Sequence, residues 1–566
     1  MKKLKRLSLL LLAACMLFAA ACGNNGPSAT PAPPAGSTPP PGGSSAPTSS
    51  AMPTPAAPDD GANIAEHIDI IVEDDFVSMN PMTTSGNSNT ATWALNLCHD
   101  RLVEHLEPGV IGPGLAERWE SSPDFKTWTF YLRDDVDWHN GEHFTAEDVK
   151  FTIEASQLYP GTRAYNCWAV VEKLEVIDQY TIELTLKTSN ADILYEWSHR
   201  GSAPIFNGKA WEDHDKGEDP TWAHVGTGPY TVKEFSSSNF FTFERNDNYW
   251  GEASPTKSMT FWTVPEQATR NVMMQNGEAQ LCFGMSPEDR DKAVANPDFQ
   301  VFTYTTLSPS SLSFNNLGTN INEYEGDELI MDKNFRLAIA HALNTEDIAL
   351  ASYGNWAMAP WDGNVWGYGV QYRLEDEIPK WEYNVDLAKE YLAQSKYDGE
   401  VIPISLVSTL PASATTAQVV QMQLKAIGIE TSIEAMDMPA LQAMHTYDAG
   451  PMNPDRQIHI FSLAANLSAM RTLKTGFYPD SVQNRINYAN TRVTELTDLI
   501  GSSDDEDARR EAAYEIQRIL YEDIASINCA YTVIGVVAAN GIDGIVFFPD
   551  NFHHNFRGMY WDTDKA

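Results

Sequence analysis

The segment from Leu115 to Val149 constrains the fold of this chain more than any other stretch of its sequence. In residues 127–133 large apolar side chains alternate with Thr, Tyr and Arg, which is the pattern of a strand with one buried face. Asn140-Gly141 follows and suits a tight turn. Thr145 and Asp148 have the spacing of a helix capping box. The segment therefore predicts a strand, a turn and a helix that begins at about Thr145.

The same segment also resembles a known family signature in the spacing of its Leu-Ala-Glu, Trp, Leu-Arg and Trp-x-x-Gly groups. It is similar to the extracytoplasmic solute-binding proteins of the oligopeptide, dipeptide and nickel class (family 5), which serve ATP-binding-cassette (ABC) importers. Asn140 stands where the family usually has Asp. Gly226 to Tyr230, with Asn246 to Trp250, resembles a second family motif, and the resemblance extends over nearly everything after residue 61.

The resemblance implies an α/β fold of two lobes, the periplasmic-binding-protein type II fold, with an extra subdomain in lobe one. A ligand enclosed between the lobes favours the closed form, which a transporter can sense. The implied function is capture of a peptide-like solute and its delivery to ABC permease subunits with cytoplasmic ATPases, by a monomer without a cofactor. We expect lobe one at 61–98, 219–306 and 525–566, its inserted subdomain at 99–218, and lobe two at 307–524.

The first 60 residues predict export and a membrane tether. Basic residues precede an apolar run that ends at Ala21 and is too short to span a bilayer, so residues 1–21 are expected to be a lipoprotein signal peptide. Cys22 is the expected lipidation site, with Cys15 and a plain cleaved signal as alternatives. Residues 22–60, rich in Pro, Ser and Ala, predict a disordered tether to the outer face of the cell membrane, or a periplasmic location.

Charge and cysteine content exclude other classes of partner. Loss of the four basic residues within 1–21 takes the formal charge from −39 to −43, which disfavours binding to nucleic acid or to an anionic bilayer through a general field. The remaining cysteines are scattered without the close spacing of a metal motif, and the sequence leaves open whether any pair forms a disulfide. They are Cys98, Cys167, Cys282 and Cys529.

The segment 461–469 departs from the family pattern. Many peptide-binding relatives carry there an Asp that pairs with the peptide's free amino group, whereas this chain has no acidic residue between His459 and Asp480. A buried ammonium without a counter-ion is costly. The segment therefore leaves two ligand classes open: a peptide with another acidic partner, or a neutral solute such as an oligosaccharide or a blocked peptide.

Aromatic residues cluster between 356 and 368, where the family has a Gly-rich segment bordering the ligand. Clustered Trp with Gly and Asn suits stacking on a flat or sugar-like ligand, and equally suits filling the core of the lobe. A turn at Asn80-Pro81 lies near the ligand by resemblance, or is a plain surface turn. The ligand-binding candidates are Met82, Asn87, Trp356, Trp361, Trp366, Tyr368, Ser462 and Asn466.

No pattern in the sequence supports catalysis. His139 to His143 spells H-x-x-E-H, but the Asn-Gly within it predicts a turn rather than the helix that this zinc motif needs. His553-His554 are expected to face solvent. No G-x-S-x-G sequence and no carboxylate pair with glycosidase spacing is present, so a cell-surface hydrolase is the weaker alternative. We expect no enzyme and no metal site.

Overall fold

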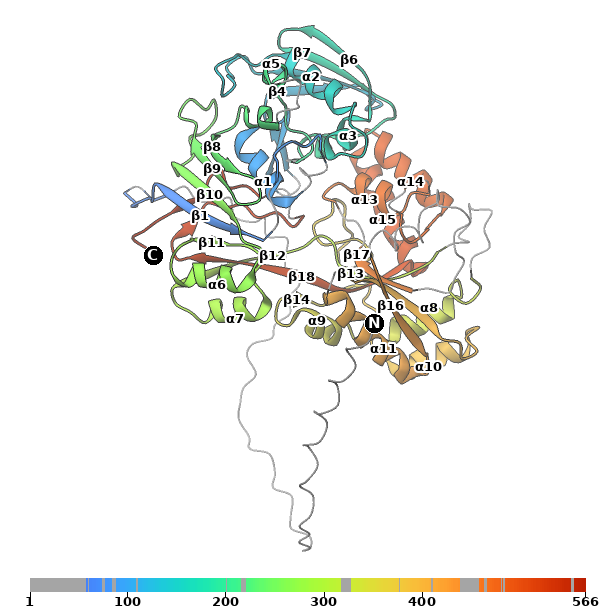
Figure 1. Cartoon of the computed structure of the whole chain (residues 1–566). Coiled ribbons are helices and arrows are strands. Elements are labelled where there is room, and N and C mark those ends of the chain that lie inside the picture. The colour runs from blue at the N-terminus through green and yellow to red at the C-terminus, as the bar shows by residue number, and fades with distance from the viewer. Residues whose placement is uncertain are drawn as a thin grey trace, which may run out of the picture. The chain divides into compact units, whose positions relative to one another are not determined.

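The structure is a computed structural model, and Figure 1 shows its helices and strands. Several predictions lie outside the residues that it describes: the signal peptide with Cys15 and Cys22, nearly all of the tether at 22–60, the ligand candidate Asn87, and the exposure of His553. The described residues are 58–59, 61–73, 77–83, 88–107, 110–199, 201–214, 220–316, 327–375, 377–408, 411–437, 458–462, 466–479, 481, 484–550 and 554–566.

A long strand, β18 (Ser526–Ala539), joins the two halves of a twelve-stranded mixed sheet (Figure 1). Its first residues pair with β13 (Ser310–Phe314) and its last residues with β11 (Leu281–Cys282) and β12 (Phe299–Thr305). Beyond β13 lie β17 (Ile458–Ser462), β15 (Ile402–Val407) and β16 (Thr431–Met436). Beyond β11 lie β1 (His67–Val72), β10 (Ser258–Thr263), β9 (Phe240–Arg245) and β8 (Tyr230–Ser236), and β14 (Ala357–Met358) pairs with β18.

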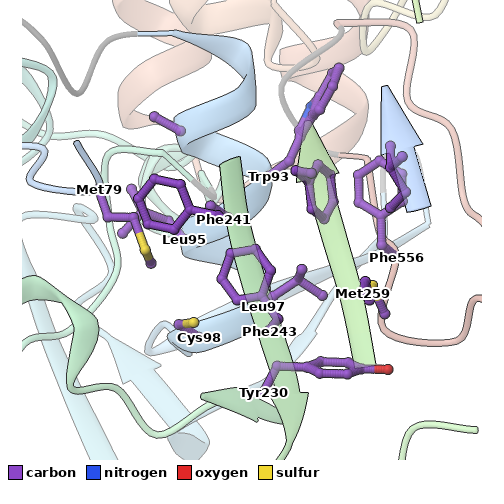
Figure 2. Close-up of a cluster of buried hydrophobic side chains, with 14 of the residues drawn as sticks. Met79, Trp93, Leu95, Leu97, Cys98, Tyr230, Phe241, Phe243, Met259 and Phe556 are labelled. Atoms are coloured by element: carbon purple, nitrogen blue, oxygen red, sulfur yellow. The ribbon is translucent and has the colours of Figure 1, made fainter. Parts of the chain in front are cut away.

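The hydrophobic core around β1 contains the apolar residues of helix α1 (Asn89–Cys98), which is buried on nearly all sides. Figure 2 shows Trp93, Leu95 and Leu97 of this helix with Phe241 and Phe243 of β9. The apolar spacing of residues 92–103 predicts a helix over that range, and its predicted end is wrong. The helix ends at Cys98 because the backbone becomes extended there. The extended backbone places the side chains of His99, Asp100 and Arg101 in buried polar contacts.

The segment 115–149 folds as predicted. Strand β5 (Thr127–Leu132) alternates buried and half-buried residues and lies in a second sheet of order β4-β5-β7-β6. Gly141 has a φ of +82°, which a glycine adopts without strain in the turn. Helix α2 (Ala146–Ser156) begins after Thr145, whose amide donates to Asp148 Oδ2 at 3.0 Å. The other strands of this sheet are β4 (Ala116–Ser121), β7 (Thr181–Leu186) and β6 (Val171–Asp178).

Helices cover the half of the large sheet that contains β13, β15 and β17. The helical spacing of apolar residues in 335–342 makes Asp332 the expected helix cap, and Asp332 caps α8 (Lys333–Ala342) by accepting from the amide of Asn334 at 2.8 Å. Apolar residues of α8 and α11 (Pro411–Ile427) share one buried cluster with those three strands. The other helices that the structure describes after residue 342 are α9 (Thr345–Tyr353), α10 (Val385–Ala393), α13 (Ala469–Gly476), α14 (Thr491–Ser502) and α15 (Glu506–Glu522).

The remaining elements among the described residues are short and mostly lie in the first half of the chain. They are β2 (Val103–Glu107), β3 (Val110–Pro113), α3 (Arg163–Trp168), α4 (Ile193–Trp197), α5 (Gly208–Asp213), the 3-10 helix η3 (Pro220–His224), α6 (Gln267–Gln275), α7 (Pro287–Val294), β19 (Ile542–Asp543) and β20 (Tyr560–Trp561). None of the helices in the described part of the chain combines the length and apolarity that a bilayer crossing needs.

Two histidine predictions have different outcomes. His139 and His143 lie on a turn, with His139 Nε2 2.9 Å from the carbonyl of Gly228 and His143 Nδ1 2.8 Å from Asp137 Oδ1, so they share no helix face. The prediction for His554 was wrong: it is fully buried, and its Nε2 lies 3.0 Å from the hydroxyl of Tyr304. Aromatic residues around it, which no local pattern indicates, exclude solvent.

Candidate ligand-binding site

A cavity of about 250 Å³ lies between segments that the sequence assigned to different lobes, and we call it the interlobe cavity. One wall comes from the expected inserted subdomain and the opposite wall from residues around the start of α13. Chain segments that follow β12 and β19 complete it. Its lining residues are His105, Arg163, Tyr195, His199, Ser202, Thr306, Ser308, Asn466, Leu467, Ser468, Arg471, Pro549 and Asp550.

Two arginines give the interlobe cavity its positive charge. Arg163 is the first residue of α3 and donates from Nη1 to Thr92 Oγ1 at 2.8 Å. Arg471 lies in the first turn of α13, where Ser468 caps the helix, and its Nη1 is 3.8 Å from Glu196 Oε2. Burial and the charge of Arg471 together lower the pKa of Arg163 to about 10. An anionic ligand group would relieve this repulsion.

Neutral polar groups and one further acid complete the interlobe cavity. His105 Nδ1 lies 2.8 Å from Ser198 Oγ, which fixes the ring against α4. His199 Nδ1 accepts from the amide of Gly201 at 3.2 Å, so in the neutral ring the proton lies on Nε2. Asp550 lines the same space. Cationic, anionic and neutral groups therefore all border one small volume.

A buried carboxylate ties the two walls together beside the interlobe cavity. Asp192 immediately precedes α4, and its side chain accepts from Ser468 Oγ at 3.0 Å and from the amide of Met470 at 3.3 Å. It also pairs with Arg509 of α15. The amide of Ala191 donates to the carbonyl of Gly501 at 2.9 Å. These contacts hold the expected inserted subdomain against the expected lobe two.

One of the predicted ligand residues, Asn466, lines the interlobe cavity. Ser462 is exposed at the end of β17, and Met82 is buried in the core around β1. Trp366 is buried in another hydrophobic cluster, which favours the packing interpretation of this aromatic residue. None of these three lines the interlobe cavity as the described residues define it.

The other aromatic candidates also contact protein groups. Trp361 stacks on Tyr531 with ring centroids 5.4 Å apart and contacts Tyr368 edge-on at 5.8 Å. Trp356 donates from Nε1 to Asp291 Oδ1 at 2.9 Å. These contacts occupy the rings, and none of the three residues belongs to the described lining of the interlobe cavity.

Sequence reasoning missed the charged residues of the interlobe cavity. Arg471 is the one of these residues that the sequence could have indicated, because it lies two residues beyond segment 461–469, where the chain departs from the family pattern. Arg163, His199 and Asp550 lie in loops or at a helix start with no surrounding pattern. Only the folded chain brings these distant positions to one cavity.

The comparisons with known proteins agree on the family. The model of bacterial extracellular solute-binding proteins, family 5 (Middle), matches residues 110–470. The nickel-binding periplasmic protein of Escherichia coli (strain K12) is 25% identical over 379 residues, which is 63% of this chain and 69% of that protein. The glutathione-binding protein GsiB of Salmonella paratyphi A is 28% identical over 329 residues, covering 57% of this chain and 60% of that protein.

A solved structure supports the fold. The structure of HbpA2 from Haemophilus parasuis superposes with a TM-score of 0.75 at 19% identity, and the match covers 88% of this chain and 99% of that one. The expected two-lobed α/β fold is thereby confirmed. Because the family model matches more than half of the chain, the chain belongs to family 5 of the bacterial extracellular solute-binding proteins.

Proposed function

We propose that this protein captures a small peptide-like solute in the interlobe cavity and delivers it to the permease subunits of an ABC importer. The observation that carries the proposal is the charge arrangement of the interlobe cavity, where Arg163 and Arg471 suit a carboxylate and Asp550 suits an ammonium. A peptide carries both groups. The protein therefore acts as a binding component rather than as an enzyme.

Asp550 supplies what the segment 461–469 lacks. That segment has no acidic residue to pair with a free amino group, but Asp550 reaches the same cavity from near the C-terminus. The name of the GsiB relative, a glutathione-binding protein, supports a peptide-like ligand. The neutral-solute alternative rested on the missing acidic residue and on ring stacking, and the aromatic residues 356–368 do not belong to the described lining of the cavity.

Calorimetry with a library of short peptides tests the ligand class. We expect binding of peptides with both ends free, and at least tenfold weaker binding after N-acetylation or C-amidation, because a hydrogen bond to a charged group contributes about 1.5–3 kcal/mol. Arg471→Gln should produce the same loss for free-acid peptides. Lys474→Gln is the matched control, since Lys474 lies on the same helix but pairs with Asp498 outside the cavity.

Equal affinity for free and blocked peptides would refute the charge-based proposal. Small-angle scattering on the same samples provides a second measurement, since a ligand that bridges both walls should reduce the radius of gyration. An oligosaccharide that compacts the protein, with no effect from any peptide, would favour the neutral-solute alternative.

We further propose that the protein is exported and lipid-anchored at Cys22 on the outer face of the membrane. The basic start, the short apolar run and the Ala-Ala-Cys sequence support this. Cys22→Ser should release the protein from the membrane fraction, whereas Cys15→Ser should leave it anchored. Release by Cys15→Ser alone would place the lipid at the other cysteine, and retention in both variants would refute lipidation at either.

A further inference from the structure

A second cavity, of about 240 Å³, lies against the core around β1 and shares no lining residue with the interlobe cavity. It is smaller than the roughly 300–1,000 Å³ of typical drug-sized sites. Its walls include the end of β1, the start of α1 and part of β18. The residues that matter for what it could bind are Glu73, Trp93, Gly284, Arg290, Tyr304 and Gly535.

Arg290 of α7 is the unusual member of this cavity, because a buried guanidinium normally has a full set of acceptors. It is 7% exposed, and its Nη1 donates to the carbonyl of Val533 at 3.2 Å. Its guanidinium carbon lies 4.5 Å from the centre of the Trp356 ring. Among the described residues Nε has no hydrogen-bond partner, and Nη2 makes no hydrogen bond with them.

The unmatched edge of Arg290 has the geometry that a carboxylate recognises. Nε and Nη2 point in parallel from one side of the guanidinium plane and can donate to two oxygens of one carboxylate. No carboxylate of the described residues lies within ion-pair distance of Arg290. Leaving such donors unmatched in a buried place is costly. Arg290 lines the second cavity, so a ligand bound there lies beside this edge.

Two glycines make room for the charged side chains of the second cavity. A Cβ on Gly535 would lie 2.7 Å both from Arg290 Cδ and from the Trp356 ring. A Cβ on Gly284, which has a φ of +70°, would collide with the carboxylate of Glu73. Both glycines line the cavity, so the backbone is shaped to admit Arg290 and Glu73.

The other walls define the rest of a ligand. Trp93, labelled in Figure 2, packs against Phe283 with ring centroids 4.5 Å apart and provides an apolar surface. The first residues of α1, a ten-residue helix, also line the cavity, and a helix N-terminus favours negative charge. Glu73, whose Oε2 is 3.7 Å from Arg270 Nη2, disfavours a second negative charge.

We infer that the second cavity binds the carboxylate of a small apolar monocarboxylic acid, with the Nε and Nη2 edge of Arg290 as the recognition element. The apolar body of the ligand lies against Trp93 and Phe283. This site is separate from the interlobe cavity and does not depend on the peptide-like ligand proposed for it.

Calorimetry of the full chain with 4-methylpentanoate tests the inference, with 4-methylpentanamide and succinate as comparison ligands. We expect the monocarboxylate to bind at least tenfold more tightly than its neutral amide and than the dicarboxylate. This comparison uses only the unmodified protein, so it does not depend on the folding of any variant. Equal affinity for acid and amide, or no binding of the acid, overturns the inference.

Variants locate the site. Arg290→Gln should weaken binding at least tenfold, Arg290→Lys should restore it only in part because Lys lacks the planar edge, and Gly535→Ala should weaken it by displacing Arg290. Lys292→Gln, an exposed cation on the same helix, is the matched control. Arg471→Gln should leave this binding unchanged, and a loss in that variant would place the acid in the interlobe cavity and overturn the inference.

Discussion

Asp100 and Arg557 form a buried ion pair, with Oδ1 and Nη1 2.8 Å apart, that joins the end of α1 to the C-terminal segment. Arg557 also donates from Nη2 to the carbonyl of His99 at 2.8 Å. Asp100 Oδ2 accepts from Thr227 Oγ1 and from Trp250 Nε1, each at 3.0 Å. The residues of the second family motif thus contribute to a buried polar network at the base of the core around β1.

Asp100→Asn should strongly destabilise the fold, because it leaves the Arg557 guanidinium buried without its counter-charge. The expected loss in the free energy of unfolding is about 3–5 kcal/mol, measured by urea denaturation. Asp135→Asn is the control, since Asp135 is half exposed and its pair with Arg133 should be worth less than about 1 kcal/mol. A loss as small as the control's would mean that Arg557 finds another acceptor.

Stability should fall as the pH drops from about 6.5 to about 4, in part because of His99. Burial lowers the pKa of His99 from 6.5 to about 4, although Ala223 and Ile205 place carbonyl oxygens at its ring nitrogens. In this window the unfolded chain binds a proton that the folded chain does not, so protons favour unfolding. The contribution of the neutral His99 to the free energy of unfolding is fully present above pH 6.5. Its loss at low pH lowers that free energy by about 3 kcal/mol.

The measurement for His99 is the urea midpoint of the protein and of His99→Gln at several pH values. The variant should be less stable at neutral pH but should lose less stability between pH 6.5 and 4. His139, also buried with a lowered pKa, is present in both proteins, so the difference reports His99. Parallel profiles would show that His99 is not kept neutral.

The four described cysteines should not react in the folded protein. Cys98, Cys167, Cys282 and Cys529 are buried and form no disulfide, and burial raises the pKa of Cys282 and of Cys529 to about 12. Because the thiolate is the reactive form, a thiol reagent should label none of the four until the chain unfolds in urea. Titration of a variant with Ser at 15 and 22 tests this, and one fast-reacting native thiol would contradict it.

Asp192→Asn should loosen the contact between the expected inserted subdomain and the expected lobe two. The change removes the charge that pairs with Arg509, and each 1.4 kcal/mol lost reduces the ratio of closed to open forms tenfold. Small-angle scattering without ligand should show a larger radius of gyration. Glu506→Gln is the control, because Glu506 pairs with the same arginine at 3.2 Å from a half-exposed position. Identical radii for all three proteins would show that apolar contacts alone hold this interface.

The order and type of many elements were readable from the sequence because their causes are local. The alternation in 127–133 predicted β5, the Thr145 and Asp148 spacing predicted the start of α2, and Asp332 predicted the start of α8. Each of these depends on residues a few positions apart. The sequence alone also determined the family, through the spacing of residues in 115–149.

Only the tertiary structure determined which charged residues border the candidate site and the second cavity. Arg163, Arg471 and Asp550 border one cavity although they come from three distant parts of the chain, and Glu73 and Arg290 border the other in the same way. Periodicity reports which face of an element is buried, but it carries no information about which partner covers that face. The end of α1 at Cys98 and the burial of His554 were missed for the same physical reason, since contacts with residues far along the chain determine both.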